Sequence, residues 1–223
     1  MALSDAQIDR FSRQIILPQI GGAGQERLLR SSVAIGGGDA DLSEIAALYL
    51  AGAGIGRIVL HGRDQSGLRA ALIDLAPDAD VSLSASRFGD VAADVLVACG
   101  AALDALDAAA AVRRPLVAGG VTGATGWLVV ASTPDVCASC AARAASEVEH
   151  ASPPDPARLS AGGLHKGPVT HVIGSLMSLA VLKLRLGLGD APGRVWLRFA
   201  AHDSTLTDHP IARAAQCPAC TAA

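Results

Sequence analysis

The sequence has no excess of positive charge, and this absence bears on two large classes of partner. The formal net charge is -3 at pH 7, and only two of the 223 residues are lysines, Lys166 and Lys183. A protein that binds nucleic acid or an anionic membrane by electrostatics needs a basic surface. We therefore expect no nucleic-acid partner and no membrane partner.

The sequence also lacks a basic, apolar leader and an uninterrupted segment of membrane length. Residues 1–10 include Asp5 where a signal peptide would be basic, and no apolar run follows them. The uncharged stretch Leu116–Pro134 is broken by glycines and threonines, which favours two short strands joined by a glycine turn. We expect a cytoplasmic protein.

Cysteines are few, but four of the five form two matched Cys-x-x-Cys pairs, Cys137 with Cys140 and Cys217 with Cys220. A two-residue spacer lets each pair point both thiolates at one ion, and two pairs complete a closed tetrahedral shell typical of structural zinc. The alternative is a pair of disulfides or incidental thiols, although nothing else in the sequence indicates an oxidising compartment. The predicted metal would tie the end of the chain to its middle.

Strand patterns and helix patterns alternate along the first part of the chain. Short apolar runs predict strands at 32–35, 57–60, 81–83, 94–97 and 115–118, and helical spacing predicts helices at 24–30, 42–53 and 103–112. A long apolar helix is expected at 169–186, followed by an alternating strand at 194–199. This alternation predicts an α/β fold in which a parallel sheet is covered by helices, with ligand sites beyond the carboxyl ends of the strands.

Several segments follow one another in an order that resembles MoeB, ThiF and HesA proteins, the bacterial relatives of ubiquitin-activating enzymes. These segments are residues 10–17, 24–28, 32–33 before a glycine loop, 49–56, 172–175 and the two cysteine pairs. The resemblance implies a Rossmann-like, mostly parallel sheet with helices on both faces, C-terminal strands and structural zinc. It also implies a dimer that binds Mg-ATP and adenylates the C-terminal glycine of a ubiquitin-like or sulfur-carrier protein.

We accordingly expect residues 1–223 to form a single ThiF/MoeB-like domain. Residues 1–31 would supply the N-terminal helices and a dimer arm, and residues 32–135 the Rossmann-like half. Residues 136–223 would supply a crossover loop, the long helix, the C-terminal strands and the zinc site. The polar segment 146–163 is interpreted as the crossover loop because core-forming sequence resumes after it.

The glycine loop departs from the pattern of the resembling family. Gly37 can stand for the first glycine of its G-x-G-x-x-G turn, but Asp39 and Asp41 occupy the region where phosphates would approach. Asp41 together with Glu44 fits a capping box, which satisfies the amides of the helix itself. These residues favour a capped helix without a phosphate site.

Two further positions depart from the family pattern. Gly62 stands where the family has an aspartate that contacts ribose, so that only Asp64 of the D-x-D pair remains, and Ala98 stands where the family has its magnesium-binding aspartate. The segment after Asp64 is shortened and lacks the family's arginine and lysine, for which Arg69 is a candidate substitute in charge. Acyl-adenylate chemistry by the family's usual residues is therefore expected to be lost, which argues against Mg-ATP as a cofactor of this chain.

Arg13 matches the arginine that members of this family extend across the dimer interface onto the partner's ATP. Two interpretations stay open: an arginine that acts on the partner subunit, or a surface salt bridge that holds the N-terminal helix. We expect a non-catalytic partner or regulatory subunit, in a homodimer or in a heterodimer with an active paralogue.

Two alternatives remain. One is an active adenylyltransferase that rebuilt its site with other residues and acts on a ubiquitin-like protein ending in Gly-Gly. In that case Asp64, Asp39 or Asp41 would hold magnesium, and Arg63, Arg69 and Lys166 would face the phosphates. The other is a binder or enzyme for another small molecule in the same cleft, using His61 and Cys99.

Overall fold

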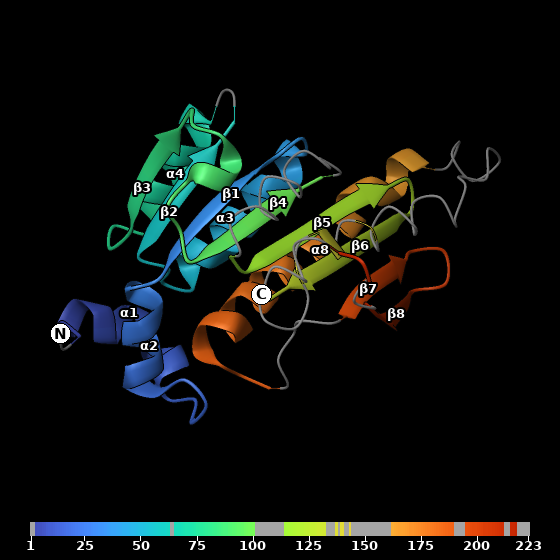
Figure 1. Ribbon diagram of the computed structural model, residues 1–223. Helices are drawn as coiled ribbons and strands as arrows, with labels where there is room; N and C mark the ends of the chain where they lie inside the picture. The colour runs from blue at the N-terminus through green and yellow to red at the C-terminus, as the bar shows by residue number, and fades with distance from the viewer. Residues whose placement is uncertain are drawn as a thin grey trace.

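A computed structural model of the protein describes residues 3–62, 65–100, 114–132, 137, 139–140, 143, 162–189, 195–211 and 215–217. The elements are, in chain order, α1 (Asp5–Ile15), α2 (Gly21–Leu29), β1 (Ser32–Gly37), α3 (Ala40–Gly52), β2 (Arg57–His61), α4 (Ser66–Leu75), β3 (Asp80–Ser84), the 3-10 helix η1 (Phe88–Asp90), β4 (Val95–Cys99), β5 (Leu116–Thr122), β6 (Thr125–Ala131), α8 (Gly162–Leu186), β7 (Val195–Ala200) and β8 (Thr205–Pro210) (Figure 1).

The strands form one eight-stranded sheet in the order β3-β2-β1-β4-β5-β6-β7-β8. Strands β3 to β5 pair in parallel, and β5 to β8 pair antiparallel. All five residues of β4 are buried, as expected for a central strand covered on both faces. The structure confirms a mostly parallel sheet, and it confirms that the uncharged stretch after residue 115 forms two strands joined by a turn.

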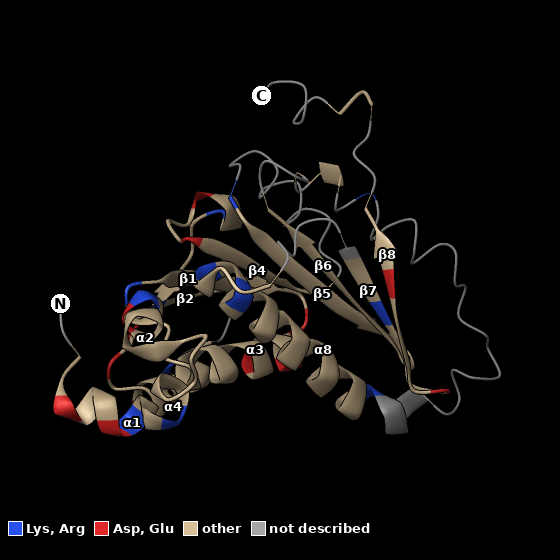
Figure 2. Cartoon of the chain, turned by 90° about the horizontal axis from the view of Figure 1, so that it is seen from below, with Lys and Arg blue, Asp and Glu red and all other residues tan. Residues whose placement is uncertain are grey.

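The helices α3, α4 and α8 all lie on one face of the sheet (Figure 2). Strand order explains this placement for α3 and α4. The chain moves in one direction from β1 to β2 to β3, and right-handed crossovers then put both connecting helices on the same side. Within the described residues the expectation of helices on both faces is therefore not confirmed. The helix expected at 103–112 lies outside the described residues.

The second face of the sheet is covered by a smaller apolar cluster. Phe88 and Val91 from the segment around η1 pack there, together with Cys140, Ile211 and Cys217. These residues come from three distant parts of the chain. The second face therefore depends on contacts between segments far apart in the chain, whereas the first face is covered by the helices α3, α4 and α8.

Close packing fixes α8 against the sheet and against α3. A side chain at Gly126 of β6 would place its Cβ 2.3 Å from Ile173 of α8, and one at Gly174 of α8 would lie 2.6 Å from Ile45 of α3. Residues Lys166–Leu186 are long and apolar enough to cross a membrane by length and composition, but half of this segment is buried inside the fold. A core helix of a globular protein has these same properties.

Candidate functional site

The glycine loop lies at the carboxyl ends of the parallel strands, where the strand order changes direction between β1 and β4. Gly37 ends β1 with φ +138°, and a Cβ there would lie 2.0 Å from the carbonyl oxygen of Cys99 at the end of β4. Only glycine can occupy such a position, because any side chain would collide with the neighbouring backbone. This requirement comes from strand packing and holds whether or not a nucleotide binds.

Asp39 pairs with backbone groups of the loop and of the first turn of α3. It is the N-cap of α3: its Oδ1 accepts a hydrogen bond of 3.0 Å from the amide of Leu42, and its own amide donates to the Cys99 carbonyl at 3.1 Å. The predicted cap was therefore right in kind but wrong in position, because Asp41 lies inside the first turn. Two amides that could otherwise face a phosphate are paired within the protein.

Among the residues that the structure describes, little positive charge is available around this loop. Lys166 of α8 lies 3.9 Å from the carboxylate of Asp41, so the two charges offset one another. Arg69 donates from Nε to the carbonyl of Val81 at 3.0 Å and thereby joins α4 to β3. The structure thus places Arg69 in a structural contact and does not bring it to the loop as a substitute for the family's arginine.

The end of β2 is held by a contact with the connection between β3 and β4. His61 Nε2 donates to the carbonyl of Ser86 at 2.6 Å, and its ring packs against Phe88 with centroids 5.4 Å apart. Because a carbonyl can only accept, Nε2 carries the hydrogen and the ring is fixed in place. Gly62 follows with φ +134°, and Asp64 lies outside the described residues.

The end of β4 offers neither a metal ligand nor a nucleophile. Ala98 is 1% exposed and pairs with Gly36 of β1, and its methyl group cannot bind magnesium. Cys99 is fully buried. Burial raises the pKa of its thiol to about 12, the negative charge of Asp39 adds to this rise, and a hydrogen bond with Ser43 opposes it. The thiol is therefore neutral at physiological pH, which argues against Cys99 as a nucleophile.

Helix α1 carries two arginines, Arg10 and Arg13, which lie in different surroundings. Arg10 donates from Nη1 to the carbonyl of Leu75 at 2.9 Å, and its Nε lies 3.4 Å from Asp78. The side chain of Arg13 is exposed and makes no hydrogen bond or ion pair with any described residue. The salt bridge that anchors α1 therefore belongs to Arg10. Sequence reasoning did not single out Arg10, because its partners are distant in the chain.

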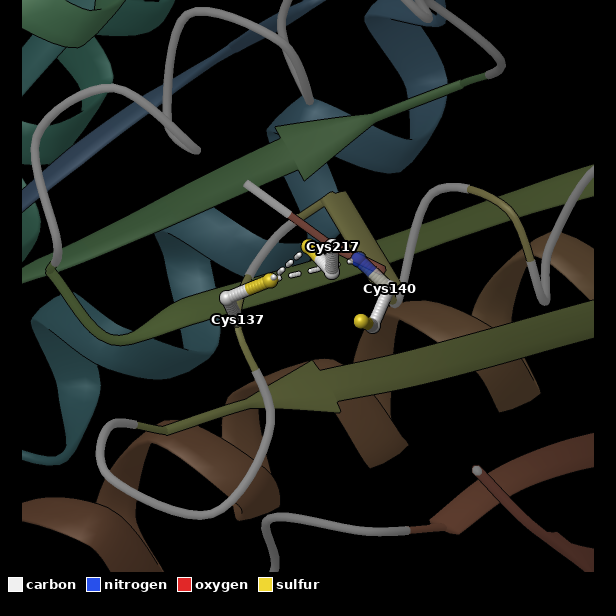
Figure 3. A group of neighbouring side chains, drawn as sticks. All are labelled: Cys137, Cys140 and Cys217. Atoms are coloured by element: carbon white, nitrogen blue, oxygen red, sulfur yellow. Dashed lines mark hydrogen bonds between the residues drawn. The ribbon is translucent and has the colours of Figure 1, made fainter. Parts of the chain in front are cut away.

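Three of the four paired cysteines, Cys137, Cys140 and Cys217, come together on the second face of the sheet (Figure 3). Their sulfur atoms all lie within 4.8 Å of one another, and the sulfurs of Cys137 and Cys217 are 3.5 Å apart. This is the distance of a non-bonded contact and is too long for a disulfide, in which the sulfurs are about 2.05 Å apart. The fourth cysteine, Cys220, lies outside the described residues.

This geometry fits a zinc ion. Tetrahedral thiolates at about 2.3 Å from zinc are about 3.8 Å apart, close to the spacing of the nearest two sulfurs. The amide of Cys140 also donates to the sulfur of Cys137 at 3.4 Å, which holds the two residues of this pair together. Three such sulfurs in an apolar cluster make a donor set that suits a soft divalent cation.

Known proteins similar to this chain are adenylyltransferases, although no protein-family model matches the sequence. The chain is 30% identical to the sulfur carrier protein ThiS adenylyltransferase of Escherichia coli, over 98% of this chain and 97% of that protein. It is 31% identical to the adenylyltransferase and sulfurtransferase MOCS3 of Aedes aegypti, over 98% of this chain but 56% of MOCS3. The chain thus spans just over half the length of that second relative.

Solved structures show the same fold at lower sequence identity. The structure of Escherichia coli MccB with ATP has a TM-score of 0.75 at 16% identity, and the match covers 97% of this chain and 75% of that chain. PaaA has a TM-score of 0.71 at 16% identity, covering 94% of this chain and 84% of that chain. At such identities the likeness concerns the fold alone.

Proposed function

The chain belongs to the MoeB/ThiF/HesA family of adenylyltransferases, and we propose that it recognises a ubiquitin-like or sulfur-carrier protein without adenylating it. In this proposal it is a non-catalytic member of a dimer, either with a second copy or with an active paralogue. The family's reaction joins AMP to the C-terminal carboxylate of the small protein. This reaction depends on groups that hold the triphosphate and its magnesium ion.

The observation that carries the proposal is that the amides at the glycine loop and at the start of α3 are hydrogen-bonded within the protein. Adenylation needs amides and cations that screen the triphosphate, together with a carboxylate that holds magnesium. Here the amides of Asp39 and Leu42 are paired inside the protein, and Ala98 stands where the family has its magnesium ligand. The carboxylate of Asp39, half-buried at the N-terminus of α3, would repel a phosphate.

Arg13 supports a role in the dimer. An arginine that stabilises developing phosphate charge in a partner subunit has to be exposed and uncommitted within its own chain. Arg13 meets this condition among the described residues, because Arg10 performs the anchoring role that was the alternative. In a mixed dimer Arg13 would act on the active subunit, while this chain's own nucleotide site would remain inactive.

Zinc is the cofactor that the cysteine cluster favours. Cys137, Cys140 and Cys217 would supply three thiolates, and Cys220 would supply the fourth. A closed shell leaves no open coordination position, so the ion would act in stability and not in the reaction. It would fasten the C-terminal segment to the second face of the sheet.

Calorimetric titration of the zinc-loaded protein with Mg-ATP tests the proposal, with Arg13→Ala as a matched control. We expect no saturable heat up to roughly millimolar nucleotide, the upper end of ordinary enzyme substrate affinities, in either protein. Saturable binding in the low micromolar range would contradict a non-catalytic role.

A second candidate function is favoured by the similarity to a ThiS adenylyltransferase over nearly its whole length. If the site has been rebuilt, ATP-pyrophosphate exchange should appear on addition of a ubiquitin-like protein ending in Gly-Gly. Exchange that is lost in Asp41→Ala would indicate that the exposed carboxylate in the first turn of α3 has taken over the binding of magnesium.

A further inference from the structure

The cysteine cluster joins two segments that are far apart in the chain. The sulfur of Cys137 lies 3.5 Å from the sulfur of Cys217, which follows it by 80 residues in the sequence. The side chain of Cys137 points toward Cys217, and the amide of Cys140 donates to the same Cys137 sulfur at 3.4 Å (Figure 3). The structure thus places a sulfur of one Cys-x-x-Cys pair in contact with a sulfur of the other pair.

The three described cysteines of the cluster differ in how far solvent reaches them. Cys137 is half-buried, whereas Cys140 is 2% exposed and Cys217 is 6% exposed. Cysteine ligands of a metal ion are all deprotonated, so their exposure decides which of them a small oxidant from solvent attacks. Such an oxidant reaches Cys137 first, and the sulfur of Cys217 already lies against the sulfur that it modifies.

The segment after β8 is attached to the second face of the sheet through two buried residues. Among the residues described in this segment, Ile211 and Cys217 belong to the second apolar cluster, whereas Ala215 and Gln216 are exposed. Strand β8 itself is exposed at all six residues. A bond from Cys217 to the other cysteine pair therefore holds the C-terminal segment on the sheet, and a disulfide within either pair would not.

We propose that the cysteine cluster is a peroxide-sensitive switch, in which oxidation joins Cys137 to Cys217, releases the zinc ion and keeps the C-terminal segment attached through a covalent bond. The switch rests on the zinc site proposed above and adds a redox role for the ligands of that site. The oxidant is a hydroperoxide, of which hydrogen peroxide is the simplest.

The oxidation proceeds in two steps. The thiolate of Cys137 attacks one oxygen of hydrogen peroxide, the O–O bond breaks and hydroxide leaves, so that Cys137 becomes a sulfenic acid. The thiolate of Cys217 then attacks the Cys137 sulfur, and the S–O bond breaks as a second hydroxide leaves. Two thiolates have lost two electrons, and the peroxide has gained them as two hydroxides, which two protons from solvent convert to water. The zinc ion has lost two of its ligands and passes into solvent.

Peptide mapping of the oxidised protein distinguishes the two kinds of disulfide. The experiment uses the zinc-loaded Cys99→Ala protein, in which the four paired cysteines are the only thiols. Trypsin cleaves after Arg113, Arg143 and Arg213, so each Cys-x-x-Cys pair stays on one peptide. A disulfide between the pairs joins the two peptides under non-reducing conditions, whereas a disulfide within a pair leaves them separate. A chromogenic chelator measures the released zinc.

We expect a few equivalents of hydrogen peroxide to release the zinc ion, to remove about two thiols per chain and to join the two peptides. Cys140→Ser and Cys137→Ser form a matched pair, because each removes one sulfur from the same Cys-x-x-Cys unit. The cross-link should persist in Cys140→Ser and should be lost in Cys137→Ser. Dithiothreitol with added zinc should restore the parent state.

Thermal unfolding gives a second readout that does not depend on mapping. A disulfide that closes a long loop restricts the unfolded chain, so the oxidised, zinc-free protein should melt about 4 °C or more above the reduced protein whose zinc a chelator has removed. The same oxidation of Cys137→Ser should give no such gain. A gain confined to proteins that hold both Cys137 and Cys217 cannot come from a general effect of peroxide on folding.

The results that would overturn the switch differ in what they say about the zinc site. Zinc in the reduced protein, with disulfides confined to single peptides or with equal cross-linking in Cys137→Ser and Cys140→Ser, would overturn the switch and leave the zinc site standing. Absence of zinc from the reduced protein would overturn the zinc site and the switch together.

Discussion

Replacing Arg10 by alanine should destabilise the protein, whereas the same change at Arg13 should not. Arg10 joins α1 to the corner between α4 and β3 through the Leu75 carbonyl and the Asp78 carboxylate, at 2.9 and 3.4 Å. The ion pair is more than a third exposed on the arginine side, and such pairs contribute about 0.2–1 kcal/mol. The hydrogen bond adds about 0.5–1.5 kcal/mol.

Loss of both interactions in Arg10→Ala should lower the free energy of unfolding by about 1–2 kcal/mol, which corresponds to about 2–8 °C in Tm for a chain of this size. Arg13→Ala should stay within about 0.5 kcal/mol of the parent, as exposed substitutions generally do. Urea unfolding followed by circular dichroism measures both changes, and the two variants control for one another because each removes one arginine from the same helix.

The effect of the same two variants on the adenylation rate of an active paralogue should have the opposite order from their effect on stability. When either variant is mixed with an active paralogue, Arg13→Ala should lower the adenylation rate of that paralogue, and Arg10→Ala should leave it unchanged at temperatures where the fold is intact. If Arg13→Ala were as destabilising as Arg10→Ala, Arg13 would be a structural residue and the reasoning that assigns it to a partner subunit would be wrong.

Three further predictions concern the cysteines and the cap of α3. Purified protein should contain about one zinc ion per chain by elemental analysis. Cys217→Ser should lose the metal and have a lower Tm, since removal of one ligand opens the coordination shell. If the purified parent protein lost its metal without a change in Tm, this prediction would be wrong. Cys99 should resist iodoacetamide at pH 8 until the chain unfolds. Burial raises the pKa of its thiol from 9.0 to about 12, so its contribution to the free energy of unfolding should be full below pH 9 and should decline as the pH rises towards 12. Cys99→Ala should remove this pH dependence of stability. Asp39→Ala should cost about 1 kcal/mol of unfolding free energy through loss of the N-cap, whereas Asp41→Ala should cost little; equal effects in denaturant titrations would place the cap at the wrong residue.

Local sequence patterns predicted most of the strands and the long helix correctly. The apolar runs that predicted strands at 32–35, 57–60 and 94–97 lie within or overlap β1, β2 and β4, because buried parallel strands need uninterrupted apolar residues. The resemblance implies C-terminal strands, but the sequence pattern does not locate the exposed strand β8. All six of its residues are exposed, so burial left no apolar pattern on them, and pairing with β7 alone makes them a strand.

Where residues of the candidate site belong to a motif or are separated by a short spacing, the sequence also predicted that they would lie close together. The two cysteine pairs predicted a common cluster, and three of the four sulfurs are found together. The cap of α3 shows the limit of such reasoning. Both Asp39 and Asp41 are acceptable N-caps in sequence, and the choice between them follows from where β1 ends against β4.

The sequence by itself thus determined the family, the mostly parallel sheet and the pairing of the cysteine motifs, because these depend on residue types and short spacings. Only the tertiary structure decided which arginine anchors α1, where Arg69 points, and that the sulfur of Cys137 lies against that of Cys217. These facts depend on contacts between residues far apart in the chain. Such contacts are set by strand order and register, and one sequence read locally does not contain them.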